Sequence, residues 1–207
     1  MRTMTTVLIS AALLGALTGC DPTPAPAPSP ETSSPKPVVT VEPTEEEPAL
    51  AALTIPDCEA LLPITLARST FADSTEFLGE TTATEYYPWY QLPAVTTAIG
   101  GVTVARACWW GVPNSDGAFS LLVAEIDPTV RASIEGALDA EGFSSVSMGT
   151  VTARENERDG EYSYEAETHL FTGTVWILAD NGSLDVSGAV AGSALDAMRT
   201  ANPTMGL

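Results

Sequence analysis

Few residues in this sequence could act as a nucleophile or a general base. His169 is its one imidazole, Lys36 is its one lysine, and no G-x-S-x-G nucleophile motif is present. The shortage of lysine excludes Schiff-base chemistry and Ser–Lys dyads. His169 lies in an alternating, strand-like stretch, where we expect it to face solvent or to cap a neighbouring group. The sequence therefore predicts no catalytic residue.

One short segment carries oxygen atoms of the kind that metal ions bind. Residues 180–185, Asp-Asn-Gly-Ser-Leu-Asp, place two carboxylates around a glycine, but the third position is Gly and no Glu stands at the twelfth position of the loop. Asn-Gly between two strands is the commonest hairpin turn. We therefore expect a turn followed by a short strand at 184–186, with no metal and no cofactor.

An acid-rich stretch at 155–167 permits two interpretations. Two carboxylates about 5 to 9.5 Å apart could hydrolyse a glycoside. A solvated strand edge or an exposed face explains the same charges without any chemistry. Both interpretations remain open at the level of the sequence.

Aromatic residues offer a possible contact surface. Flat rings with polar tips bind sugars and peptides at a low cost in conformational entropy. Neighbouring residues on a strand point to opposite faces, so of the adjacent pair of tryptophans one should be in the core and the other could line a groove. Filling the core is the competing role for all these rings. The candidate ligand-binding residues are Tyr86, Tyr87, Trp89, Tyr90, Trp109 and Trp110.

The charge of the chain restricts its partners. It has 8 basic and 27 acidic residues, a net charge of -19. The arginines after residue 53 are scattered singly and form no basic patch in the sequence. Such a chain is repelled by nucleic acid, so we expect no nucleic-acid partner.

The first twenty residues indicate export. One positive charge and no acid are found in residues 1–6, and an apolar run of 11 residues follows at 7–17. A membrane-spanning helix needs about 20 apolar residues, so the run has the length of a signal peptide instead. An ordinary signal peptide that ends near a buried cysteine is the alternative.

The four residues Leu17-Thr18-Gly19-Cys20 resemble the lipobox of bacterial lipoproteins. The resemblance implies that residues 1–19 are removed and that the Cys20 thiol receives a lipid carrying acyl chains such as palmitate. The protein would then be anchored on the outer face of the cytoplasmic membrane, in the cell envelope. The mature chain would have seven basic and 27 acidic residues, a net charge of -20.

A tether and a single domain are expected after the anchor. Residues 20–53 hold nine of the 16 prolines and show no apolar periodicity. A proline-rich segment extends by about 3.1 Å per residue, so it could hold a domain up to about 100 Å from the membrane. Residues 54–207 are then long enough for one globular domain with one core.

Two cysteines remain once Cys20 carries lipid. An exported compartment permits Cys58 and Cys108 to form a disulfide, which would close a loop of 51 residues. Two free thiols or a metal site are the alternatives, but no C-x-x-C spacing supports a metal site.

The pattern of the domain predicts an α+β fold, an antiparallel sheet flanked by a few helices. We expect a helix from Cys58, capped by Asp57, and a long, partly structured connection of irregular pattern at 69–91. A hairpin at 102–112 and 118–126 should precede a helix that begins at Asp127-Pro128 and ends at Gly142. We also expect a helix at 93–99, strands at 146–157, 161–171 and 174–179, and a last helix near 189–200. One face of the strand at 161–171 should be exposed to solvent.

Two short motifs of this domain resemble secreted actinobacterial lipoproteins of unknown function. They are a helix that begins with cysteine, Cys58-Glu59-Ala60-Leu61-Leu62, and a strand that carries Cys108-Trp109-Trp110. The resemblance implies no catalytic residues. We therefore expect a non-enzymatic, lipid-anchored binding or accessory domain, whose partner would be a cell-wall glycan, a peptide or an envelope protein. A carboxylate-dependent envelope hydrolase is the alternative.

Overall fold

The computed structural model describes residues 52–86, 92–159, 164–180 and 182–207, all within the unit Pro48–Leu207. The lipobox with Cys20, the tether, and the aromatic residues Tyr87, Trp89 and Tyr90 lie outside the described residues. Within the described part, no helix is long and apolar enough to cross a membrane.

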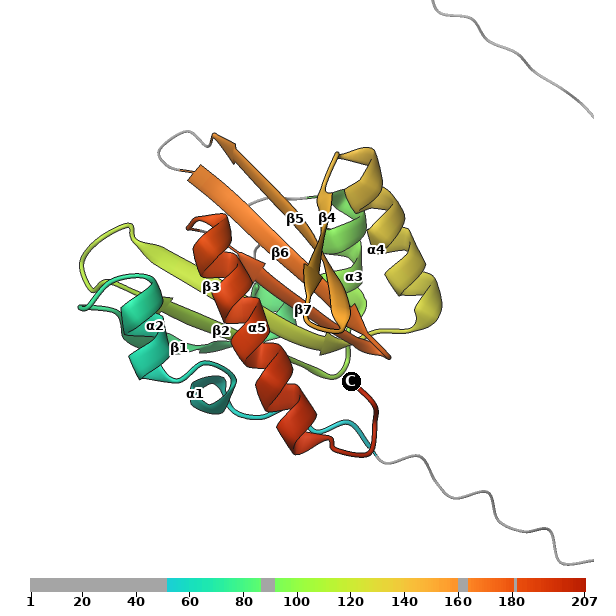
Figure 1. The fold of residues 1–207 in the computed structure, drawn as a ribbon, viewed down its shortest axis with the longest axis horizontal. Coiled ribbons are helices and arrows are strands. Elements are labelled where there is room, and N and C mark those ends of the chain that lie inside the picture. Colours follow the sequence, from blue (N-terminus) through green and yellow to red (C-terminus); the bar gives the residue numbers. More distant parts are fainter. Residues whose placement is uncertain (1–51, 87–91, 160–163, 181) are drawn as a thin grey trace, which may run out of the picture. The chain divides into compact units, whose positions relative to one another are not determined.

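Seven strands and several helices make up the described domain (Figure 1). The strands are β1 (Glu76–Thr81), β2 (Ala105–Gly111), β3 (Ala118–Glu125), β4 (Ser144–Met148), β5 (Val151–Asp159), β6 (Tyr164–Thr172) and β7 (Val175–Asp180). The helices are α1 (Cys58–Leu61), α2 (Ile64–Thr70), α3 (Pro93–Gly101), α4 (Pro128–Ala140) and α5 (Leu184–Ala201), with a 3₁₀ turn, η1, at Ala83–Glu85.

The strands form one antiparallel sheet in the order β1-β2-β3-β7-β6-β5-β4. The chain builds it from two meanders, β1 to β3 and β4 to β7, which meet where β3 pairs with β7. Helices accompany this sheet, so the expected α+β fold is confirmed.

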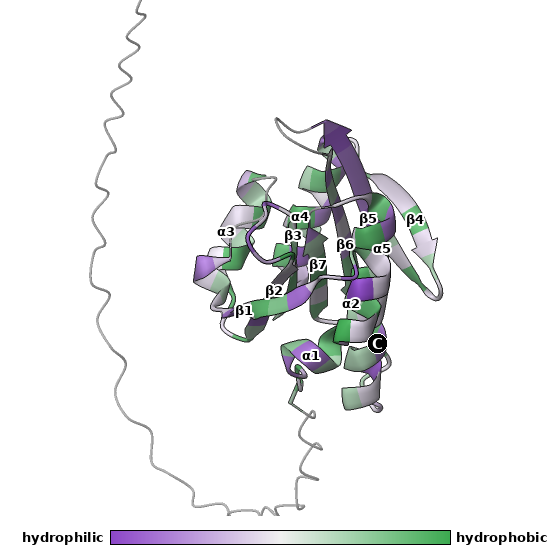
Figure 2. Ribbon diagram, turned by 90° about the vertical axis from the view of Figure 1, so that its left-hand side faces the viewer, coloured by the Kyte–Doolittle hydropathy of each residue, from purple (hydrophilic) through white to green (hydrophobic). Residues whose placement is uncertain are grey.

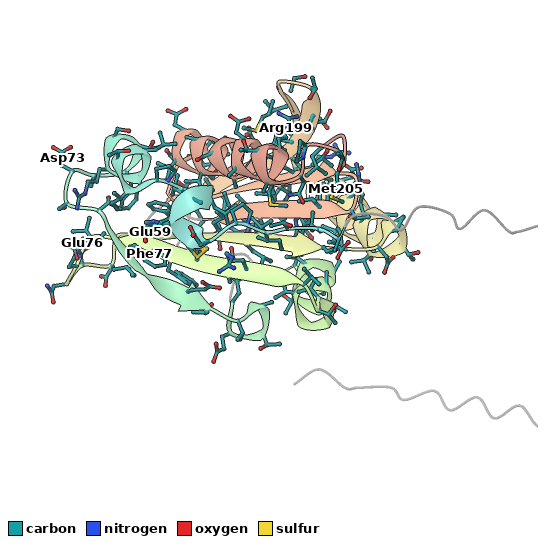
Figure 3. The ribbon with its side chains drawn as sticks, turned by 90° about the horizontal axis from the view of Figure 1, so that it is seen from below. Glu59, Asp73, Glu76, Phe77, Arg199 and Met205 are labelled. Atoms are coloured by element: carbon teal, nitrogen blue, oxygen red, sulfur yellow. A yellow bond between two sulfur atoms is a disulfide. The ribbon has the colours of Figure 1, made fainter. Side chains whose placement is uncertain are left out.

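Each face of the sheet is covered by helices. Figure 3 shows α5 on one side of the strands and α3 on the other. Because neighbouring strand residues point to opposite faces, Leu121 packs into the core under α1, α2 and α5, whereas Leu122 packs under α3 and α4. We call these the α5 face and the α3–α4 face. Leu195 of α5 and Ile134 of α4 are buried members of the two cores.

The disulfide joins the start of the domain to its sheet. Cys58 and Cys108 are bonded at an S–S distance of 2.07 Å, which confirms the expected pairing. Both are buried in the core of the α5 face, and Trp110 lies in the same core. The bridge therefore ties α1 to β2.

Local sequence signals correctly predicted where several elements begin. Asp127 caps α4 by accepting hydrogen bonds from the backbone amides of Thr129 and Val130, at 2.7 and 3.0 Å, and Pro128 begins the helix. Asp57 likewise accepts from the amide of Ala60 to cap α1. The hairpin of β2 and β3 is also confirmed.

Two expectations for secondary structure are wrong, and a third lacked an element. The partly structured connection expected at 69–91 contains β1, an edge strand with a bulge between Phe77 and Gly79 that was not predicted from the sequence. The strand expected at 184–186 is instead the first turn of α5, because the Ser183 hydroxyl caps that helix by accepting from the amide of Val186. The strand expected at 146–157 is two strands, β4 and β5, which turn at Gly149.

The sheet is also less exposed to solvent than expected. Consecutive residues of β6 from Ala166 to Thr172 are buried, so the face of this strand that was expected to be wet is covered. Covering by helices on both sides is the reason. Figure 2 shows hydrophilic colouring concentrated where β5 and β6 extend beyond the helices.

Candidate functional site

A groove of about 850 Å³ lies between α3 and the beginning of α4, at the end of β3. Its size falls within the range of about 300 to 1,000 Å³ that is typical of small-molecule sites. Five residues of α3 line one side, and residues at the β3–α4 junction line the other. The lining residues are Pro93, Ala94, Thr97, Ala98, Gly101, Val102, Thr103, Glu125, Ile126, Asp127, Pro128, Val130, Ser133 and Thr174.

Two prolines that begin helices line the groove. Pro93 occupies the first turn of α3, and Pro128 occupies the first turn of α4. Val95 and Ile99 hold α3 against the sheet, and Ile134 does the same for α4. The α3 residues that line the groove are small, so space remains between the helices.

The floor and the walls of the groove are mainly apolar. Ile126 and Ala98 are buried, and Val130 is half-buried. The backbone amide of Ile126 donates to the carbonyl oxygen of Thr174 at 2.8 Å, which fixes the end of β3 beside β7. This lining contains hydroxyl groups and carboxylates but no His, Cys, Lys or Arg. Such a composition suits binding by burial of apolar surface rather than nucleophilic catalysis.

The described members of the predicted aromatic surface are divided between the two faces of the sheet. Trp110 is fully buried on the α5 face, stacked against Phe119 with ring centroids 5.8 Å apart. Tyr86 is 2% exposed on the α3–α4 face, and its hydroxyl bonds to the Ser120 hydroxyl at 2.9 Å. Both rings are therefore core residues and not part of an exposed platform.

Trp109 is half-buried, unlike the other two described members of the predicted set. Its ring contacts Tyr86 at 5.9 Å between centroids, and it lines a shallow hollow of about 370 Å³ beside β1. Leu78, which is 52% exposed, lines the same hollow. The expectation that Trp109 and Trp110 point to opposite faces is confirmed.

The described carboxylates of the acid-rich stretch lie on both faces of the sheet. Glu155 pairs in register with Thr168, and Asn156 with Glu167, so Glu155 and Glu167 point to opposite faces of the sheet. Arg158 holds Glu165 at 2.9 Å. Glu155 and Glu167 therefore cannot act together on one substrate.

His169 is fully buried, so of its two expected roles the solvent-facing one is wrong, and its ring instead hydrogen-bonds to neighbouring side chains. The indole N–H of Trp176 donates to His169 Nδ1 at 3.3 Å, and the opposite ring nitrogen lies 3.2 Å from a Glu167 oxygen. An indole N–H can only donate, so Nδ1 accepts and Nε2 carries the proton toward Glu167. This network satisfies polar groups inside the core of the α3–α4 face.

The described residues contain no group of three or more His, Cys, Asp or Glu side chains that could hold a metal ion. The segment expected to be a hairpin turn at 180–185 instead connects β7 to α5.

No family model matches this chain, and no curated protein matches it. Among solved structures, the crystal structure of a GTP-binding regulator from Thermotoga maritima is similar over 63% of this chain and 82% of that chain, at 9% sequence identity and a TM-score of 0.35. A similarity this low carries no functional argument.

Sequence reasoning missed the groove. Its two sides come from segments about thirty residues apart, and no local pattern joins them. The available signals were the two helix-starting prolines, Pro93 and Pro128, and the small residues of α3.

Proposed function

We propose that this protein is a lipid-anchored binding protein of the cell envelope and that the groove between α3 and α4 binds a small, mainly apolar ligand. The observation that carries the proposal is the groove itself, an apolar hollow of about 850 Å³ on a well-packed framework. Sites of this kind gain affinity by removing the apolar surface of a ligand from water.

The framework supports a ready-made site. The groove residues Ala98 and Ile126 belong to the continuous core of the α3–α4 face, together with Ile99 of α3 and Ile134 of α4. A rigid site does not need to be ordered by its ligand, so less of the binding energy is lost.

The expected anchor supports a role near the membrane. The lipobox residues and the proline-rich segment that follows them would hold the domain within about 100 Å of the outer face of the membrane. Apolar molecules that move between membrane and wall are ligands within this reach. A glycan-binding platform has less support because Tyr86 and Trp110 lie in the core.

Decanol tests the proposal, because it offers a straight apolar chain with a neutral head group. We expect saturable binding to the purified domain by calorimetry. Thr97→Trp should weaken it, because Thr97 lines the groove and a large ring there would occupy space for the chain. Displacing two methylene groups at about 0.8 kcal/mol each corresponds to a loss of roughly tenfold in affinity.

Thr96→Trp is the matched control. Thr96 is the neighbouring exposed residue of the same helix, and it does not line the groove. We expect this variant to bind decanol as the unmodified domain does. Equal binding by both tryptophan variants, or no binding by the unmodified domain, would contradict the proposed site.

A further inference from the structure

The groove has a negatively charged end. Glu125 is the last residue of β3 and is half-buried, and Asp127 is the N-cap of α4. Both line the groove, beside apolar residues such as Ile126 and Pro128. The other polar side chains of the lining are hydroxyl groups, which carry no charge.

The two carboxylates differ in their interactions with the rest of the protein. Asp127 uses Oδ1 to accept from two backbone amides at the start of α4, and these hydrogen bonds hold the pKa of its carboxyl below the usual range. Glu125 donates its backbone amide to the carbonyl oxygen of Val104 at 2.9 Å. Its carboxylate forms no ion pair with any residue that the structure describes.

No arginine is among the residues that line the groove. Arg131, on the first turns of α4, is held by Glu135 at 3.1 Å and lies over the ring of Phe171, 5.5 Å from its centroid. The other arginines of the described domain are also engaged within it, through carboxylates or backbone carbonyl groups. These are Arg68, Arg106, Arg154, Arg158 and Arg199.

From this arrangement we propose that the groove selects a cationic amphiphile, with its apolar body between α3 and α4 and its ammonium or guanidinium group at Glu125 and Asp127. The inference rests on the proposed function and adds the charge of the ligand to it. The net charge of the chain, -19, acts in the same direction, because it attracts cations and repels anions at long range.

Three probes with one decyl chain separate the head groups: decylammonium, decanol and decanoate, each used below its micelle concentration at neutral pH. We expect the unmodified domain to bind decylammonium most tightly and decanoate most weakly. Added salt should reduce the differences, because exposed charges are screened over about 10 Å at 0.1 M ionic strength.

Glu125→Gln should weaken decylammonium binding by about two- to fivefold, the range for partly exposed ion pairs, and this loss should exceed any change in the binding of decanol, which carries no charge. Glu59→Gln is the control, since it removes the same charge from an exposed position on α1, on the opposite face of the sheet. It should change neither affinity.

The outcomes distinguish the two proposals. If no decyl probe binds, the proposed function fails. If the three probes bind equally well, or if Glu125→Gln leaves decylammonium binding unchanged, the charge selectivity fails while the apolar groove remains a binding site. Tighter binding of decanoate than of decylammonium would overturn the inference outright.

Discussion

Reduction of the Cys58–Cys108 disulfide should remove a large share of the stability of the domain. The bridge joins residues 50 apart in sequence, so it closes a loop of 51 residues that includes α2, β1 and α3. In the chain-entropy model, a loop of this length restricts the unfolded state by about 4 kcal/mol at 25 °C. Small domains are stable by about 5 to 15 kcal/mol, so the loss is a substantial fraction of the whole.

Urea denaturation of the oxidised and the reduced domain measures this difference. We expect the midpoint to fall by an amount equivalent to about 4 kcal/mol, and the melting temperature to fall by roughly 10 °C. Reduction leaves both sulfur atoms in the core, whereas Cys58→Ala with Cys108→Ala also removes buried volume. The double variant should therefore be less stable than the reduced domain, because its core has lost contacts.

The reduced domain should still be folded. Leu61 is fully buried, and its carbonyl oxygen accepts a hydrogen bond from the Ser193 hydroxyl of α5 at 2.9 Å. These contacts hold α1 in place without the bridge, so hydrogen exchange in α5 should remain slow under native conditions. A loss below about 1 kcal/mol on reduction would refute the chain-entropy reasoning for this bridge.

Three further results are expected. Tyr86→Phe should cost about 1 to 2 kcal/mol in the free energy of unfolding because it leaves the buried Ser120 hydroxyl without its partner, and adding Ser120→Ala should recover part of the loss in a double-mutant cycle. Burial raises the pKa of Glu155 above its usual range, so its ionisation at neutral pH lowers the stability of the folded state. Glu155→Gln should therefore raise the melting temperature at pH 7. This gain should vanish below the unfolded-state pKa near 4.5, because the carboxyl is then protonated in both the folded and the unfolded state. Cys20→Ala should release the protein from membranes in cell fractionation while circular dichroism shows a folded domain, since the proposed lipidation site and the core belong to separate parts of the chain.

The sequence predicted elements whose ends are marked by local chemistry. Asp127 and Pro128 define the start of α4 through a cap and a preset backbone angle, and neither depends on tertiary contacts. The cysteine pairing could be predicted because the expected lipidation of Cys20 leaves one possible pair, Cys58 and Cys108.

Features that depend on distant parts of the chain could not be predicted in this way. His169 follows a strand pattern with polar residues at alternate positions, yet its ring is buried against the rings of Phe143 and Trp176. Strand β1 was not predicted because a bulge at Gly79 interrupts the alternation of its side chains at the edge of the sheet. The groove depends on the distance between α3 and α4, which is set by how both helices pack on the sheet.

Methyl NMR during a titration with decanol tests the central claim most directly, because it reports where on the domain the ligand lies. The groove methyl groups of Val102, Ile126 and Val130 should shift in a saturable way. The methyl resonances of Val186 and Val190, on α5 at the opposite face of the sheet, should not shift. Shifts centred on α5, or no shifts in the groove at saturating decanol, would contradict a binding site between α3 and α4.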